Sequence, residues 1–145
     1  MNIETKYFGS MIVEEEKVIR FEKGLPGFQD ETGFVLIDFP ENPVFRILQS
    51  IKTPPVAFVV ASPYHFHKDY AFDLDEPIKE ALAITKAEQV NVLAILTLRD
   101  PFANSTINLQ APIIINGESL KGQQVILSDA FSSRTPLQAE KARME

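Results

Sequence analysis

Short apolar runs, interrupted by glycine, proline or clustered polar residues, constrain the fold more than any other feature of this sequence. The runs are rich in valine, isoleucine and phenylalanine, which favour strands. Ten of them predict strands, at residues 3–8, 11–13, 18–21, 34–39, 44–49, 56–61, 90–98, 106–110, 113–115 and 123–127. Many short strands at close spacing are typical of an antiparallel fold, so we expect a mainly β protein that is β-barrel-like or a sandwich.

Turn and helix signals fill the spaces between these runs. Asn116-Gly117 is a strong hairpin signal between two predicted strands. One or two short helices are predicted at about residues 76–89. Asp75 suits the N-cap of the first helix, and Thr85 with Glu88 suits a capping box that begins a second.

The length of 145 residues suits one domain that buries its own core. We therefore expect a single domain over residues 1–145, with a polar C-terminal tail from about residue 138. The chain has no cysteine, which excludes disulfides, cysteine-ligated zinc and thiol nucleophiles. No secretory signal is recognisable, and no apolar stretch approaches the roughly 20 residues of a spanning helix. We expect a soluble cytoplasmic protein, away from membranes and monomeric when free.

The charge balance favours some partners over others. The net charge is −6 and the pI is near 5.0, so phosphate backbones are repelled and direct nucleic-acid binding is disfavoured. A basic protein partner would be attracted. The carboxylates gather in two stretches, at Glu14-Glu15-Glu16 and between residues 69 and 80. The second stretch has three interpretations: a glycosidase-like acid pair, a solvated helix start, or an acidic binding patch.

Catalytic and metal-binding patterns are sparse. The sequence contains no phosphate loop, dinucleotide fingerprint or serine nucleophile elbow. His65 and His67 would share one face of a strand, where Asp69 or Asp73 could complete a metal site, and either histidine could act as a general base. The alternative is two histidines in a loop after Pro63. Because a third nitrogen or sulfur ligand is lacking, we expect no metal, no cofactor and no enzymatic activity.

Aromatic residues offer candidate contacts for a partner. The chain has 11 phenylalanines and no tryptophan, and most of these rings should lie in the core. Phe28 and Phe102 lie beside turn signals, where a ring either anchors a partner or packs over the end of the fold.

Four segments in order and at matching spacing resemble one known family. They are Gly24-Leu25-Pro26-Gly27-Phe28; Leu48-Gln49-Ser50 with the apolar run that ends before Ser62-Pro63; residues 106–116, which read TINLQAPIIIN; and residues 122–127, which read GQQVIL. Together they resemble the flagellar assembly factor FliW over nearly the whole chain. Phe131 departs from the tyrosine expected there. Several motif residues have structural explanations: the glycines suit a tight turn, and Asn108 can tie a neighbouring loop by hydrogen bonds.

The resemblance implies a partner switch without covalent chemistry. FliW-like proteins bind flagellin before its export, and when free they bind CsrA, a basic RNA-binding repressor of flagellin translation. We expect an acidic surface for CsrA, formed by Glu14, Glu15, Glu16, Asp73, Asp75 and Glu76. We expect an apolar groove for the amphipathic helices of flagellin, formed by Leu25, Pro26, Phe28 and Phe102. A β-barrel module that binds a small molecule or carbohydrate is the alternative.

Overall fold

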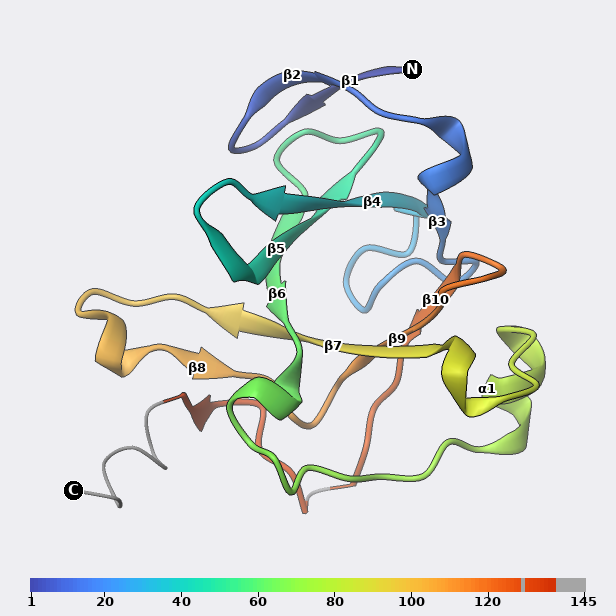
Figure 1. The fold of residues 1–145 in the computed structure, drawn as a ribbon, viewed down its shortest axis with the longest axis vertical. Helices are drawn as coiled ribbons and strands as arrows, with labels where there is room; N and C mark the ends of the chain where they lie inside the picture. The colour runs from blue at the N-terminus through green and yellow to red at the C-terminus, as the bar shows by residue number, and fades with distance from the viewer. Residues whose placement is uncertain (129, 138–145) are drawn as a thin grey trace.

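The computed structural model describes residues 1–128 and 130–137, which form eleven strands in two sheets and one α-helix (Figure 1). The strands are β1 (Asn2–Thr5), β2 (Gly9–Ile12), β3 (Ile19–Arg20), β4 (Gly33–Phe39), β5 (Asn42–Ser50), β6 (Ala57–Ala61), β7 (Val90–Thr97), β8 (Thr106–Ile107), β9 (Ile113–Asn116), β10 (Lys121–Gln124) and β11 (Thr135–Pro136). The helix α1 spans Glu76–Ala81, and 3-10 turns occur at η1 (Glu15–Lys17), η2 (Pro63–His65), η3 (Ala87–Gln89) and η4 (Phe102–Asn104). The predicted mainly β, barrel-like fold is confirmed; the predicted tail from residue 138 lies outside the described residues.

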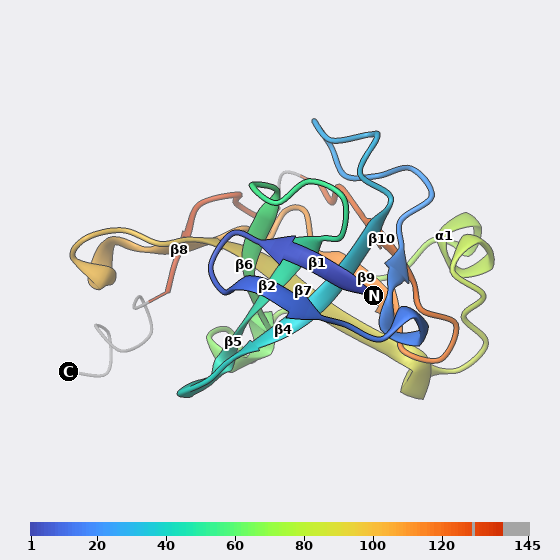
Figure 2. The same ribbon diagram turned by 90° about the horizontal axis from the view of Figure 1, so that it is seen from above.

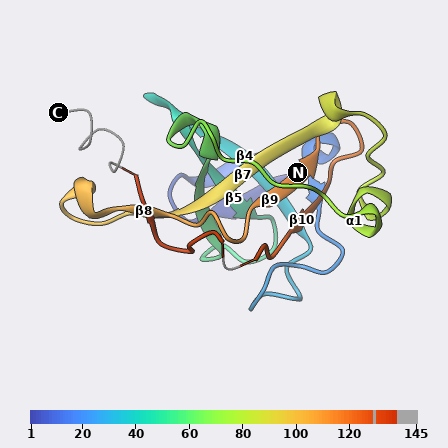
Figure 3. The ribbon, with the colours of Figure 1, turned by 90° about the horizontal axis from the view of Figure 1, so that it is seen from below.

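Seven strands close into a ring because β7 pairs with both β6 and β9. The order around the ring is β7, β6, β5, β4, β3, β10 and β9. Neighbours are antiparallel except β3 and β10, which share a single parallel pair, Arg20 with Lys121. Strands β8 and β11 extend from the ring as an arm beside the far end of β7 (Figure 3). The β1–β2 hairpin lies against the outer face of β4 and β5, where Ile3 packs with Val35, Ile37 and Ile47 (Figures 1 and 2).

Side chains fill the interior of the ring. Its innermost members, Phe21, Phe34, Leu48, Val60 and Ile113, are fully buried. The rings of Phe21 and Phe34 meet edge to face, with centroids 5.3 Å apart. The interior is therefore a packed core, unlike the open cavity that a barrel for small ligands requires.

A buried glutamine explains one of the family-like motifs. Gln49 is fully buried on β5. Its side-chain nitrogen donates to the carbonyl oxygens of Ser50 at 3.0 Å and Pro54 at 3.1 Å, while its oxygen accepts from the backbone N–H of Lys6 at 3.0 Å. Gln49 thus joins the N-terminal hairpin to the β5–β6 turn, so this motif residue has a structural role.

Three predicted strands end about three residues beyond the observed strands, and the bounds of the others differ by one or two residues. The run at 3–8 ends at Thr5, whose hydroxyl accepts the N–H of Phe8 at 2.9 Å and donates to the carbonyl of Gly9 at 2.8 Å, forming a turn. The run at 106–110 ends at Ile107, because Asn108 Oδ1 accepts the N–H groups of Gln110 and Ala111. The run at 123–127 is paired as a strand only over β10, which ends at Gln124.

The predicted position of the helical segment is correct, but the predicted capping interactions are not. Asp75 precedes α1, yet its side chain makes no capping hydrogen bond; its backbone carbonyl accepts the N–H groups of Ile78 and Lys79. The capping box predicted for Thr85 and Glu88 is wrong by one residue. Gln89 instead accepts the N–H of Thr85 at 2.7 Å through Oε1, so a 3-10 turn and no second α-helix forms there.

Candidate binding surfaces

One end of the ring is a polar mouth, because its inward-facing rows end in polar side chains. On β4, Phe34 and Leu36 face the core and Asp38 is the next residue on that face. On β5, Leu48 faces the core and Arg46 follows on the same face, directly opposite Asp38. Charged residues on these interior rows mark where the packed core gives way to solvent.

Three carboxylates gather on one side of this mouth. Glu14, Glu16 and Asp38 line an open hollow of about 510 Å³, together with the cations Lys17 and Arg46. We call Glu14, Glu16 and Asp38 the acidic mouth. Sequence reasoning missed Asp38, although its alternation with two apolar residues of β4 was a usable signal.

The other predicted acidic residues lie around the start of α1. Asp73 lines a second hollow with Lys79 and Lys86, and Glu76 forms an exposed ion pair with Lys79 at 3.4 Å. Asp75 is exposed and immediately precedes the helix. Glu76 of this second group is thus already ion-paired, whereas within the described residues no ion pair joins the carboxylates of the acidic mouth to Lys17 or Arg46.

The 24–28 loop places one predicted apolar residue inside the protein and two outside. Leu25 is only 2% exposed and belongs to the core, so it anchors the loop and is unavailable to a partner. Pro26 is exposed, and Phe28 is 40% exposed while packing edge-on against Phe58 at 5.5 Å. Gly24 has φ +63°, and a Cβ there would lie 2.6 Å from the carbonyl oxygen of Gln29, so only glycine fits.

A buried carboxylate holds the far end of this loop. Glu31 accepts hydrogen bonds of 2.5 Å from both the Ser50 and Thr53 hydroxyls. Lys52 Nζ donates to the carbonyl oxygen of Asp30 at 2.9 Å. The loop that presents Phe28 is thereby fixed to the β5–β6 turn, which gives a partner a preorganised surface.

This carboxylate predicts an acid-dependent loss of stability. Burial alone would raise the pKa of Glu31, but hydrogen bonds from Ser50 and Thr53, with the charge of Lys52, outweigh it and lower the pKa. A lowered folded-state pKa stabilises the fold above the unfolded pKa, and that stabilisation is lost as pH falls through the folded pKa. We expect Glu31→Gln to lower the unfolding free energy by about 2 kcal/mol at pH 7.

Urea unfolding of both proteins at pH 7 and at pH 3 measures this effect. The difference between them should shrink at the lower pH, because the wild-type carboxyl is then increasingly protonated. A difference that stays constant with pH would show that the charge of Glu31 is not involved.

Phe102 lies on a different apolar surface from Phe28. It is 43% exposed in η4, at the end of the arm, and its ring meets Phe45 at 6.2 Å. Phe45 in turn stacks on Phe66 at 6.3 Å. The arm extends to the left in Figures 2 and 3, whereas the light-blue segment around residues 24–28 extends to the top of Figure 2 and to the bottom of Figure 3. The two phenylalanines therefore do not form one groove.

The two histidines are not arranged as a strand-borne metal pair. His65 lies in η2 with its ring edge-on to Phe66 at 4.9 Å, and His67 Nε2 lies 3.1 Å from the carbonyl oxygen of Pro136. Within residues 1–128 and 130–137, no three His, Cys, Asp or Glu side chains are grouped to hold a metal ion. The loop interpretation of these histidines is the correct one.

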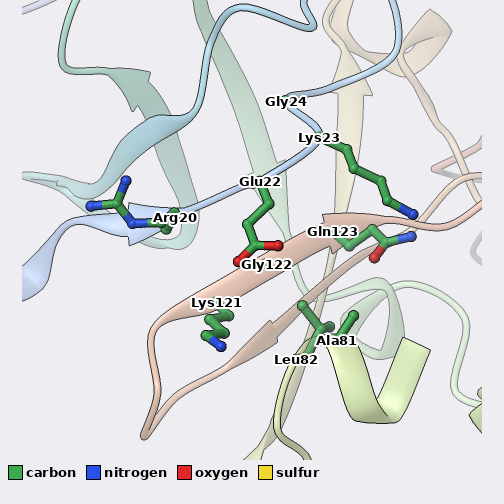
Figure 4. A pocket seen from close by; sticks show the side chains of 9 residues that line it. All are labelled: Arg20, Glu22, Lys23, Gly24, Ala81, Leu82, Lys121, Gly122 and Gln123. Atoms are coloured by element: carbon green, nitrogen blue, oxygen red, sulfur yellow. The ribbon is translucent and has the colours of Figure 1, made fainter. Parts of the chain in front are cut away.

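A small hollow near the β3–β10 junction is rimmed by cations. Arg20, Lys23 and Lys121 surround it with Glu22, but their side chains diverge (Figure 4). Its volume of about 30 Å³ holds little more than one water molecule. Over the part of the chain that is described, no helix is long and apolar enough to cross a membrane.

Together these features define a class of protein: a β-rich ring with a packed interior and with separate charged and apolar patches exposed on its surface. Comparison with known proteins specifies the family. The model of the family described as "FliW protein" matches residues 2–138, so the chain belongs to the FliW family.

Individual relatives agree with this assignment. The chain is 51% identical over 130 residues to the flagellar assembly factor FliW of Bacillus velezensis, covering 90% of this chain and 91% of that protein. It is 45% identical over 140 residues to the FliW of Oceanobacillus iheyensis, covering 96% and 95%. A crystal structure of the flagellar assembly factor FliW superposes with a TM-score of 0.91 at 41% identity, covering 94% of this chain and 96% of that one.

Proposed function

We propose that this protein is a cytoplasmic partner switch that acts by binding and not by catalysis. It binds flagellin before export, and when free it binds CsrA and relieves the repression of flagellin translation. The observation that carries the proposal is membership of the FliW family, whose curated relatives are named flagellar assembly factors. We propose further that it is monomeric when free and binds no nucleic acid directly.

For CsrA, we propose that the acidic mouth is the main contact. A basic protein complements its carboxylates, and negative charge placed beside bound CsrA would repel RNA phosphates. Glu15, which is exposed in η1 between Glu14 and Glu16, extends this surface. The group of Asp73, Asp75 and Glu76 contributes less, because Glu76 is already ion-paired with Lys79.

For flagellin, we propose that the 24–28 loop receives the apolar face of an amphipathic helix. Phe28 provides an exposed ring, Pro26 an exposed neighbour, and Leu25 anchors the loop from within. An aromatic side chain held on a rigid loop is a typical binding anchor, because little conformational entropy is lost when a partner docks.

Two matched phenylalanine variants test this assignment. We expect Phe28→Ala to weaken flagellin binding about tenfold, and Phe102→Ala to change it less than about twofold, since truncating an anchor costs on the order of 1–2 kcal/mol. Isothermal titration of each variant with flagellin gives the affinities, and thermal unfolding shows that each variant is folded. The reverse ranking would move the flagellin site to the arm.

A further inference from the structure

Another hollow, separate from those described above, is lined by Arg46 and by residues of β7. It has a volume of about 430 Å³, and none of its lining residues is a carboxylate. Its polar lining consists of a guanidinium, two hydroxyls and a carboxamide, from Arg46, Ser62, Tyr64 and Asn91. Apolar side chains complete it, from Ala87, Val90, Val92 and Leu93. In a protein of net charge −6, a hollow that combines one cation with neutral donors and no acid is distinctive.

The strands place two of these donors beside the core. Arg46 lies two residues from the core residue Leu48 on the inward row of β5, and Asn91 lies two residues before the core residue Leu93 on β7. The exposed Ser62 comes directly after the end of β6. The exposed Asn91 lies beside the β9–β10 hairpin, opposite Ile115 of β9. A Cβ added to Gly117 would lie only 2.8 Å from Asn91 Nδ2, so glycine there makes room for the amide.

The half-buried guanidinium is available to a ligand. Although Arg46 stands opposite Asp38 in the strand register, its side chain makes no ion pair or hydrogen bond with any residue in the described ranges. The Tyr64 hydroxyl is protonated at neutral pH, as in any tyrosine, and can donate a hydrogen bond; partial burial raises its pKa further. The planar guanidinium can bind both oxygens of a carboxylate while neighbouring donors complete its solvation.

We propose that this hollow, the Arg46 hollow, binds a carboxylate whose adjoining apolar atoms contact the half-buried Val90 and Val92. The carboxylate is supplied by an acidic side chain on a peptide segment or by a free dicarboxylic acid. Because the negative charge of Asp38 repels any anion bound at Arg46, the acidic mouth lowers the affinity of this site for a carboxylate. The Arg46 hollow and the acidic mouth thus select for opposite charges at neighbouring positions.

The test is an NMR titration of the whole protein with three probes. They are a capped tripeptide of alanine, glutamate and leucine, the same peptide with glutamine for glutamate, and free glutarate. We expect the glutamate peptide to shift the Arg46 Nε–Hε signal saturably and the glutamine peptide to bind about tenfold more weakly, because a charged acceptor strengthens the bidentate contact. Tighter binding of the peptide than of glutarate identifies a protein ligand, and the opposite order identifies a small acid.

Two variants and a control make the test specific. Arg46→Gln should abolish the saturable shift of the Tyr64 and Asn91 signals, whereas Asp38→Asn should tighten binding several-fold by removing a repulsive charge. Arg99→Gln, on the exposed 98–101 segment, is the matched control and should bind as the wild type does. The proposal is overturned if neither carboxylate probe shifts these signals saturably, or if Arg46→Gln and Arg99→Gln bind them alike.

Discussion

Reversing the three charges of the acidic mouth, by Glu14→Lys, Glu16→Lys and Asp38→Lys together, is expected to weaken binding to CsrA about 100-fold, since close interfacial charge pairs couple by more than 1 kcal/mol each. The reason is twofold. The variant loses attraction for a basic partner, and it gains three cations beside Lys17 and Arg46 in the same hollow.

The matched control reverses the three acids near α1, Asp73, Asp75 and Glu76, with the same total change in charge. Its effect should be less than about tenfold, because Lys79 already pairs with Glu76 in this group. Biosensor measurements at 50 and 300 mM salt give the association and dissociation rates separately. Long-range electrostatic attraction raises the association rate, and this effect weakens with salt. Equal losses in both triple variants would mean that net charge, and not the mouth, governs binding.

Replacing Asn116 by alanine is expected to lower the unfolding free energy by about 3–5 kcal/mol, because several buried polar groups lose their partners at once. Asn116 is fully buried at the end of β9. Its Nδ2 donates to the carbonyls of Leu82 at 2.8 Å and Ala83 at 3.1 Å. Its Oδ1 accepts the N–H groups of Glu118 at 2.8 Å and Ser119 at 3.2 Å.

One side chain therefore ties the end of α1 to the β9–β10 hairpin. Urea unfolding at pH 7 measures the loss, and Asn104→Ala, at an exposed position of η4, is the control that should change stability by less than about 0.5 kcal/mol. If both variants unfold at the same urea concentration, the four hydrogen bonds of Asn116 contribute little to stability. The asparagine at the end of the 106–116 motif would then need another explanation.

Short apolar runs bounded by turn residues made the β fold predictable, since the positions of β4 to β7 follow from their own sequences. The strand ends were less predictable because side-chain hydrogen bonds set them. The hydroxyl of Thr5 ends β1, and the amide of Asn108 ends β8. The two-residue strand β11 has no signal of its own, because it exists only through pairing with β8.

The same holds for the candidate surfaces: some of their residues could be predicted from the local sequence, and others depend on how distant strands pair. Phe28 was predictable as an exposed ring, but Leu25, one turn earlier, was not predictable as core, because its burial depends on the closure of the ring. Asp38 was missed although its alternation with Leu36 placed it on the inward face. Arg46 lines both the hollow of the acidic mouth and the Arg46 hollow. This position depends on the pairing of β4, β5 and β6, so it could not be predicted from the sequence of any one strand.

The most direct test of the proposed function is size-exclusion chromatography with light scattering of this protein mixed with its host's flagellin, with its host's CsrA, and with both. The partner switch predicts a stable complex in each binary mixture, and the loss of the CsrA complex when flagellin is added. A folded protein that binds neither partner would contradict the proposed function.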